Sequence, residues 1–332
     1  MKPTIKEVMT FLNKEVDAWT DHYLKDIKTN WQPSDFLPDS TSDTFIQDVI
    51  ELRELSKELP DDFFVVLVGD TITEEALPTY ETWLMHLDGV DIKDDTGWSK
   101  WVRGWTGEEN RHGDLLNKYL YLTGRVNMRE VEVSTQHLIA DGYDIETGTH
   151  PYKNFVYTSF QELATKVSHM RVGNLAKMFG NKSLSRMCKV IAADEGRHAT
   201  AYKHFVKRIF EVDPSEMMLS FADMMKRKVT MPAHYMRESG GPKGDIFERF
   251  SETAQQLGVY TFRDYIDIMD SLIQEWKIEE IVGLNDQAER ARDYLVKLPS
   301  RFERVLERMK LPEINHDFKW IIPSKDVAPI IL

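Results

Sequence analysis

The sequence contains a single cysteine, Cys188, so its 332 residues hold no internal disulfide. A reducing compartment is the natural setting for such a chain. Packing must supply its stability, for which 42% hydrophobic residues are ample. No apolar run approaches the roughly 18 residues that span a bilayer, and charged residues interrupt the N-terminal segment where a signal peptide needs an apolar core. These absences argue against secretion and against insertion into a membrane.

Positive charge is also scarce, because 42 lysines and arginines face 55 acidic residues and leave a net charge of −13. This balance excludes broad nucleic-acid binding, since phosphates would be repelled over most of the surface. An acidic protein partner would need a local basic patch. Lys203, Lys207 and Arg208 form one candidate patch, and residues 226–228 form another. Taken alone, each cluster is better explained as a solvated helix face.

Hairpin signals are scarce as well, and the heptad-like spacing of apolar residues predicts an all-α protein. Residues 63–68 are aromatic and β-branched, so propensity alone would favour a strand. They continue without a stop signal into residues 71–77, and we therefore predict a buried central helix. Pro78 should kink that helix or remove one of its hydrogen bonds.

No repeat or change in composition divides the chain, so we predict a single helical domain over residues 1–332. Its expected parts are an N-terminal helix with a proline-rich loop over 1–43, a core bundle over about 44–210, and flanking helices with a tail over 211–332.

Three segments contain Glu-x-x-His. Two of them, Glu109 to His112 and Glu195 to His198, lie in periodic sequence, whereas Glu313 to His316 follows Pro312 in a poorly periodic tail and is best explained as a chance match. Residues three apart share one face of a helix, so each pair can offer an oxygen and a nitrogen to one metal. The motif is weak by itself. Each of the first two copies, however, continues an apolar stripe, the first of which begins at Trp98, so both pairs should point inward. Buried carboxylates and imidazoles are costly unless they are paired or coordinated. The repetition favours metal ligands over buried ion pairs.

A bundle site for two metal ions needs two further glutamates, one from each remaining helix. Glu162 lies on a stripe of apolar and small residues, and so does Glu74. Glu75 competes with Glu74, and spacing alone does not choose between them. His169 also faces inward, where it is better explained as a satisfied core histidine.

Long strings of the sequence are similar to the soluble acyl-carrier-protein desaturases. These strings occupy residues 31–33, 35–39, 65–70, 72–80, 108–120, 157–162, 192–198 and 221–234. The resemblance covers nearly the whole chain, and strings of this length are highly specific. It implies a ferritin-like four-helix bundle with additional flanking helices.

The resemblance also implies a site for two iron ions and favours Glu74 over Glu75. Glu74 and His112 would serve one iron, Glu162 and His198 the other, and Glu109 and Glu195 would bridge them.

Four further residues gain roles from the same resemblance. Thr165 would lie beside the oxygen-binding side of the site, and Trp105 would line the cavity. Trp31 and Asp194, together with His112, would carry electrons inward. Each of these residues has an alternative explanation as a core or supporting residue.

The implied reaction is the oxygen-dependent removal of two hydrogens from an acyl chain on acyl carrier protein, which leaves a cis double bond at the 9 position. Ferredoxin would be the electron donor in this step of fatty acid biosynthesis, and the enzyme would be a homodimer. Its location would be the cytoplasm of a bacterium or, for a mature plant form, the plastid stroma. An acyl hydroxylase on the same scaffold and a ferritin-like iron oxidase are the alternatives.

The resemblance places the closed end of the substrate tunnel near Trp83, Leu87, Asn154 and Phe155. Trp83 and Asn154 depart from the family pattern, and a larger residue at this end would favour a shorter chain or shift the position of the double bond. Because acyl carrier protein is acidic, the resemblance also raises Lys226, Arg227 and Lys228 to docking candidates.

Overall fold

The computed structural model describes residues 3–310 and 316–326. Within these ranges the chain forms thirteen α-helices, a few short 3-10 helices and no strand, which confirms the predicted all-α fold. The α-helices are α1 (Ile5–Tyr23), α2 (Phe45–Lys57), α3 (Asp61–Glu75), α4 (Leu77–Met85), α5 (Gly97–Thr123), α6 (Met128–Asp141), α7 (Pro151–Met178), α8 (Lys182–Val212), α9 (Pro214–Arg227), α10 (Phe247–Gln256), α11 (Phe262–Glu275), α12 (Asp286–Val296) and α13 (Leu298–Leu306).

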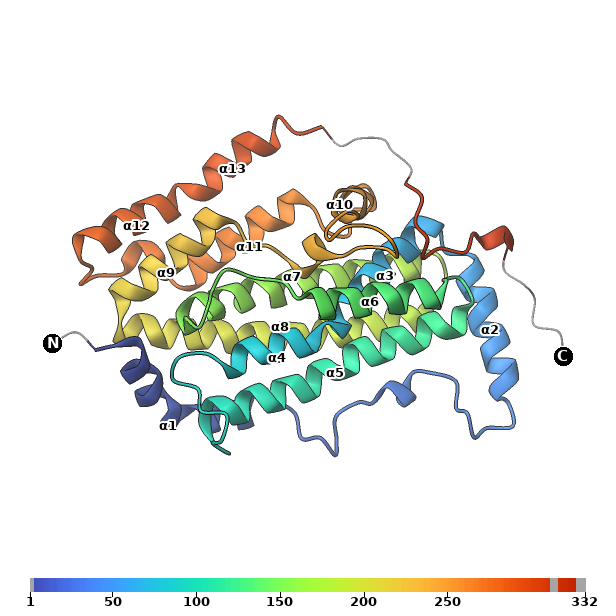
Figure 1. The fold of residues 1–332 in the computed structure, drawn as a ribbon, viewed down its shortest axis with the longest axis horizontal. Helices are drawn as coiled ribbons and strands as arrows, with labels where there is room; N and C mark the ends of the chain where they lie inside the picture. The colour runs from blue at the N-terminus through green and yellow to red at the C-terminus, as the bar shows by residue number, and fades with distance from the viewer. Residues whose placement is uncertain (1–2, 311–315, 327–332) are drawn as a thin grey trace.

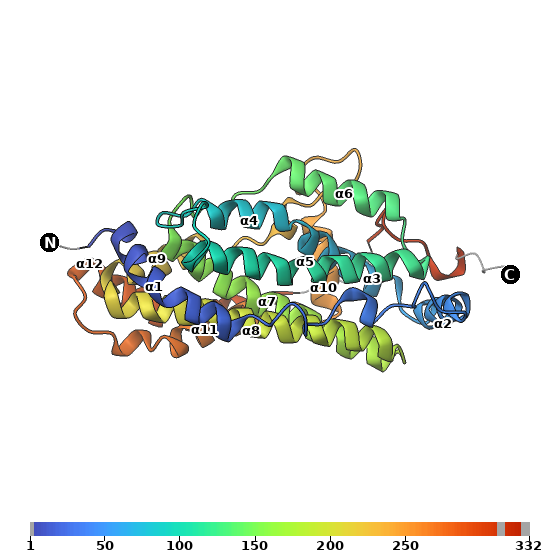
Figure 2. The same cartoon turned by 90° about the horizontal axis from the view of Figure 1, so that it is seen from below.

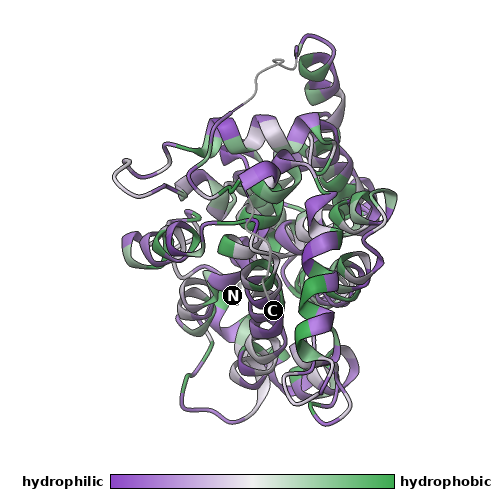
Figure 3. Cartoon of the chain, turned by 90° about the vertical axis from the view of Figure 1, so that its right-hand side faces the viewer, coloured by the Kyte–Doolittle hydropathy of each residue, from purple (hydrophilic) through white to green (hydrophobic). Residues whose placement is uncertain are grey.

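Helices α3, α5, α7 and α8 form the central bundle, and α7 packs against α8 along its length (Figure 1). Helices α9 to α13 cover one side of the bundle, whereas α1 and the segment that follows it run along another (Figures 1 and 2). One cluster of buried apolar side chains extends from Val8 to Trp320. Viewed from one end, the helices show alternating hydrophobic and hydrophilic stretches, as expected for helices with one buried face (Figure 3). The division of the chain near residues 43 and 210 stays a prediction.

Helix α3 confirms the helical interpretation of residues 63–68. Its side chains from Phe63 to Gly69 are all buried, because α5, α6, α7 and α10 surround the helix. Burial on every side therefore accounts for the strand-like composition of this segment. The helix ends at Glu75, and α4 begins at Leu77 with Pro78 in its first turn. Pro78 thus marks a break between two helices, where its missing N–H costs no helical hydrogen bond.

Helices α5 and α8 carry the two Glu-x-x-His segments that were predicted to face inward, and both have buried faces. Residues 313–315 of the third segment lie outside the described residues. In α5, the side chains of Trp98, Trp101 and Trp105 are buried on the stripe that leads to Glu109. Helix α8 begins at a cap in which the Asn181 side chain accepts a hydrogen bond from the Leu184 amide. None of the described helices is both long and apolar enough to cross a membrane.

Candidate metal centre

Six side chains from the four bundle helices meet in the interior of the bundle. They form two groups in which the possible ligand atoms lie within 4.8 Å of one another. One group is Glu74, Glu109, His112 and Glu195, and the other is Glu109, Glu162, Glu195 and His198. Glu109 and Glu195 belong to both groups, which is the arrangement that two bridged metal ions require. The structure thus brings together all six residues that the sequence predicted as ligands.

A glycine allows α3 to approach α5 at this point. A Cβ atom at Gly113 would lie 2.9 Å from the Glu75 side chain and 3.3 Å from the Glu74 backbone. The glycine therefore lets Glu74 reach His112 on the neighbouring helix. Glu75 points elsewhere and accepts hydrogen bonds from Asn117 and Thr135. This geometry supports the choice of Glu74 over Glu75.

The atoms that could bind a metal lie close together, but several of them form no hydrogen bond. Nδ1 of His112 lies 3.1 Å from Glu109 and 3.4 Å from Glu195, and Nδ1 of His198 lies 2.5 Å from Glu109. Five buried atoms that face the site nevertheless have no hydrogen-bond partner among the described residues: Glu109 Oε1, His112 Nδ1, Glu162 Oε2, Glu195 Oε1 and His198 Nδ1. His112 Nε2, on the other side of its ring, also makes no hydrogen bond to a described residue and lies 3.6 Å from Asp194. Buried polar atoms are rarely left unpaired in proteins. The convergence of the first five atoms on two common points fits a pair of metal ions.

The charges of the site also fit cations. Burial and the neighbouring carboxylates of Glu109 and Glu195 raise the pKa of Glu162 well above its usual value. Burial and the carboxylates of Glu109 and Glu74 raise the pKa of Glu195. Such crowded carboxylates resist ionisation together unless a positive charge joins them. Metal ions would provide that charge.

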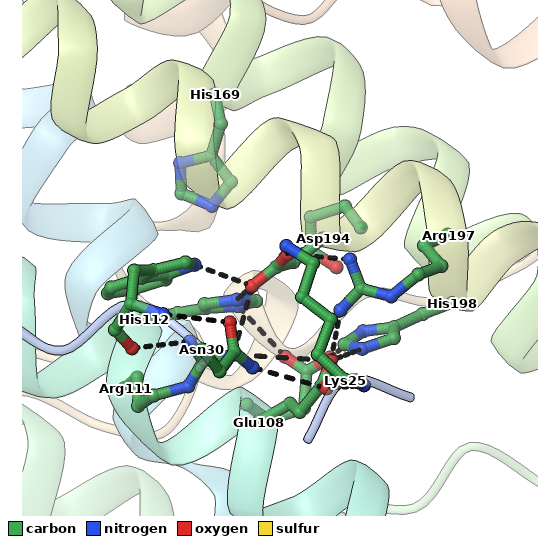
Figure 4. A network of polar contacts seen from close by, with 12 residues as sticks. Lys25, Asn30, Glu108, Arg111, His112, His169, Asp194, Arg197 and His198 are labelled. Atoms are coloured by element: carbon green, nitrogen blue, oxygen red, sulfur yellow. Dashed lines mark hydrogen bonds and ion pairs between the residues drawn. The ribbon is translucent and has the colours of Figure 1, made fainter. Parts of the chain in front are cut away.

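The second ring nitrogen of each histidine faces another carboxylate (Figure 4). Nε2 of His112 lies 3.6 Å from Asp194, and Nε2 of His198 lies 2.9 Å from Glu108. A carboxylate in this position orients a metal-binding imidazole and leaves its other nitrogen toward the metal. Glu108 was missed in the sequence, although a signal existed: an acidic residue precedes both Glu109 and Glu195.

Cationic side chains stabilise the two supporting carboxylates, and these residues were also missed. Arg111, Arg197 and Lys25 contact Asp194 at 2.9, 2.7 and 3.0 Å, and Arg197 also pairs with Glu108 (Figure 4). Although burial opposes ionisation, His112 and Arg197 hold the pKa of Asp194 well below its usual range. Asp194 therefore stays ionised.

Trp31 connects Asp194 to the edge of the molecule. Its indole N–H donates to Asp194 at 2.8 Å, and its ring lies parallel to the His112 ring at 6.0 Å between centroids. The guanidinium of Arg111 lies over the Trp31 ring at 4.2 Å. The ring of Trp31 is only partly buried. The residues of the predicted electron route are thus contiguous, and their role stays a prediction.

Thr165 and Trp105 lie on the cavity side of the site. The indole of Trp105 donates to Glu162 at 2.9 Å, whereas the Thr165 hydroxyl donates to backbone carbonyls of its own helix. His169, interpreted from sequence as a core histidine, has Nε2 at 2.7 Å from Glu74. It therefore contacts the site directly.

A cavity of about 170 Å³ opens beside these residues. Glu74, Glu109, Trp105 and Thr165 line one part of it, and apolar side chains of α10 and of the 3-10 helix η2 (Pro232–Tyr235) line another. A smaller pocket shares Tyr80, Trp105 and Gln161 with this cavity and continues past it.

The predicted tunnel residues separate into two pairs. Trp83 and Asn154 line the smaller pocket, where Trp83 packs edge to face on Tyr143 at 4.7 Å. Leu87 and Phe155 are buried but line neither of the two pockets. Trp83 and Asn154 therefore remain candidates for contact with a ligand in the cavity.

The predicted docking residues Lys226, Arg227 and Lys228 lie at the end of α9 and differ in their surroundings. Arg227 is paired with Glu146 and Asp223, and Lys226 lies over the Tyr294 ring at 5.1 Å. Lys228 is exposed, and no ion pair joins it to a described residue. The alternative cluster is largely neutralised, since Lys203 and Arg208 pair with acidic side chains.

Comparisons with known proteins agree with this geometry. The model of the fatty acid desaturase family matches residues 4–322. A chloroplastic stearoyl-[acyl-carrier-protein] 9-desaturase of Gossypium hirsutum is 51% identical over 304 residues, which cover 89% of this chain and 76% of the relative. Stearoyl-[acyl-carrier-protein] 9-desaturase 5 of Oryza sativa subsp. japonica is 53% identical over 335 residues, covering 98% and 84%. The X-ray structure of DesA2 from Mycobacterium tuberculosis H37Rv matches with a TM-score of 0.51 at 18% identity, over 82% of this chain and 96% of that chain. It shows a shared fold.

Proposed function

The chain belongs to the fatty acid desaturase family, and we propose that it desaturates a saturated acyl chain carried on acyl carrier protein, with a cis double bond introduced at the 9 position. Relatives named as stearoyl-[acyl-carrier-protein] 9-desaturases share about 50% sequence identity with it over most of its length. The observation that carries the proposal is the pair of overlapping carboxylate and histidine groups beside a cavity in such a chain. Fold alone would not support an activity.

We propose two iron ions as the metals. Glu74 and His112 would hold one, Glu162 and His198 the other, and Glu109 and Glu195 would bridge them. Carboxylates with imidazoles suit iron that changes its oxidation state, and the five unpaired donor atoms support this assignment. Bound iron would supply the activation of dioxygen.

The protein contributes orientation and a dry environment. Asp194 and Glu108 hold the two imidazoles with Nδ1 toward the metals, and Trp105 orients Glu162 through its indole N–H. The apolar side chains of the cavity exclude water and hold one pair of carbons beside the site, which accounts for a large part of the rate in reactions of this kind.

We further propose ferredoxin as the electron donor and a homodimer as the assembled form. Reduction would reach the site through Trp31, Asp194 and His112, which are in contact. The plastid stroma, or the cytoplasm in a bacterium, is the proposed location. The relatives' names, which include the word chloroplastic, support the first of these.

Product analysis tests the activity. The iron-loaded protein is supplied with oxygen, ferredoxin, its reductase, and stearoyl or palmitoyl carrier protein, and the products are analysed by mass spectrometry with location of the double bond. We expect a 9-unsaturated product. A hydroxylated product would instead favour the hydroxylase, and rapid ferrous oxidation without any acyl product would favour the iron oxidase.

We propose that Trp83 limits the length of the acyl chain that the protein accepts. This side chain lines the pocket that continues beyond the metal site, so a smaller residue should leave room for a longer chain. Trp83→Leu should shift the ratio of activities on 18-carbon and 16-carbon substrates toward the longer one. Leu87→Ala is the matched control, because Leu87 lines neither pocket. An unchanged ratio in Trp83→Leu would refute this role.

We propose that docking of the acidic carrier protein depends on residues 226–228, with Lys228 as the strongest contributor because no described residue forms an ion pair with it. Lys228→Ala should raise KM for the carrier substrate several-fold at low salt and much less at high salt, because salt screens exposed charges. Arg227→Ala should change KM less, since Arg227 is already paired with two carboxylates. Equal KM values in wild type and Lys228→Ala would contradict the assignment.

A further inference from the structure

A continuous chain of aromatic side chains leads from the metal site to α1. Trp105, which donates to Glu162, lies 6.2 Å from Tyr202 between ring centroids, and Tyr202 lies 5.6 Å from Trp101. Phe205 contacts both Trp101, at 4.9 Å, and Trp19 of α1, at 5.4 Å. All these separations fall within the range of direct contact between aromatic rings. We call these five residues the aromatic chain.

A hydrogen-bonded pair stands at the outer end of the aromatic chain. Trp19 contacts the ring of His204 at 4.9 Å, and His204 Nδ1 lies 2.9 Å from the hydroxyl of Tyr23. Both Tyr23 and His204 are only partly buried, so solvent reaches this end. Burial and the positive charges of Arg208 and Lys207 lower the pKa of His204. Its ring is therefore neutral at physiological pH, and Nδ1 can accept the phenolic proton.

Packing alone does not explain the residue types in the aromatic chain. The indole nitrogen of Trp101 and the hydroxyl of Tyr202 are buried and face each other, and neither has a further hydrogen-bond partner among the described residues. Phenylalanine would fill such positions without leaving a polar atom unpaired in the interior. What tryptophan and tyrosine add is a ring that can lose one electron.

From this geometry we propose that Tyr23 and His204 form a redox-active site that returns one electron, through the aromatic chain, to the oxidised metal centre when no acyl chain occupies the cavity. This inference rests on the proposed function, which supplies oxygen as the oxidant. In each event one electron leaves Tyr23 for the centre, the phenolic O–H bond breaks, and an N–H bond forms at His204 Nδ1. The products are a neutral tyrosyl radical and an imidazolium. A thiolate in solution then gives one electron to the radical and becomes a thiyl radical, and two such thiyl radicals combine to a disulfide. His204 returns its proton to the phenolate oxygen of Tyr23. The oxidising equivalent is thereby removed without damage to the ligands.

Electron paramagnetic resonance tests the proposal on the iron-loaded protein, which is reduced and then mixed with oxygen without an acyl substrate. Rapidly frozen wild-type samples should contain a tyrosyl radical, identified by the narrowing of its signal when the tyrosines are ring-deuterated. The radical signal should be several-fold weaker in Tyr23→Phe. Tyr121→Phe is the matched control, because Tyr121 is an exposed tyrosine, at 65%, outside the aromatic chain. An unchanged radical yield in Tyr23→Phe overturns the proposal.

Peptide mass spectrometry provides a second readout on the same samples. Oxidised forms of Trp101, Trp105 and Tyr202 should increase several-fold in Tyr23→Phe, because the oxidising equivalent stays inside the protein. Tyr202 also contacts Phe205 directly, at 5.4 Å, so Trp101 is not an obligatory link. Trp19 alone among the five residues contacts the ring of His204. Trp19→Leu should therefore interrupt the chain and lower the Tyr23 radical although Tyr23 is intact. A damage pattern equal to that of wild type in both variants contradicts the route.

The product assay with stearoyl carrier protein separates this inference from the proposed function. Unsaturated product without a Tyr23 radical overturns the inference and leaves the function standing. A preparation that forms no product and consumes no oxygen contradicts both.

Discussion

Helices α5 and α8 are built alike around the candidate metal centre, and they differ in what lies behind each histidine. Each carries an acidic residue directly before its Glu-x-x-His segment. Each of these acids reaches across to the histidine of the other helix, so that Asp194 of α8 supports His112 of α5 and Glu108 of α5 supports His198 of α8. The centre therefore has two matching halves, as a site for two equivalent metals requires.

The surroundings of the two supporting carboxylates break this symmetry. Asp194 accepts the indole N–H of Trp31, an aromatic ring that is partly exposed. Glu108 accepts the amide N–H of Lys25 and the side-chain amide of Asn30, and among the described residues no tryptophan or tyrosine donates to it. The features that the two halves share support metal binding. Among the described residues, the His112 half differs because Trp31 connects it to the partly exposed surface next to Asp194. On the Glu162 side, the aromatic chain that begins at Trp105 runs separately toward Tyr23.

Removal of a ligand from one half should have the largest effect. Glu74→Gln keeps the shape of the side chain and removes the charge that would bind the first iron. We expect the metal content to fall from two ions to about one per chain and desaturation to be lost. Glu75→Gln is the matched control. Glu75 is the next residue and lies outside both ligand groups, so the Glu75→Gln variant should still bind two ions. Metal analysis and product yield check this prediction, and equal metal loss in the two variants would contradict the assignment of Glu74.

Substitution of the supporting carboxylates should test whether the halves are equivalent. Asp194→Asn and Glu108→Gln each remove the charge behind one histidine, and each should weaken metal binding by about 10–100-fold. Titration with ferrous ion would measure this loss in both. Only Asp194→Asn should also slow reduction by ferredoxin, because only Asp194 contacts Trp31. If both variants slow reduction equally, the halves are equivalent in electron transfer too, and the comparison fails.

Local periodicity allowed prediction of the all-α fold and of the inward faces of five of the six convergent residues, whereas Glu74 was chosen by the resemblance to the acyl-carrier-protein desaturases. The Glu-x-x-His spacing and the apolar stripe from Trp98 to Trp105 place side chains on one face of a helix, and burial follows from that face. The choice between Glu74 and Glu75 could not follow from periodicity, because it depends on the close approach that Gly113 allows between two helices.

Residues that act across helices were missed for the same physical reason. Lys25, Arg111 and Arg197 meet at Asp194 from three different segments of the chain, and no spacing within one helix signals such a meeting. His169 was recognised as inward-facing, but its partner Glu74 lies 95 residues away. The aromatic chain likewise joins α1, α5 and α8. Long-range contacts therefore set the limit of prediction from this sequence.

Substitution of Trp31 should have a smaller effect and would show how the two halves differ. Trp31→Phe keeps an aromatic ring parallel to His112 but loses the N–H that donates to Asp194. Trp31→Ala loses both. If the hydrogen bond carries the electron, both variants should be reduced by ferredoxin several-fold more slowly than wild type, with unchanged metal content. If ring contact carries it, only Trp31→Ala should be slow.

Stopped-flow reduction by ferredoxin measures the rates. Reduction by dithionite is the control, because a small reductant does not have to dock beside Trp31. Wild-type rates in both variants would show that electrons reach the centre by another path, and the asymmetry between the halves would then have no role in reduction.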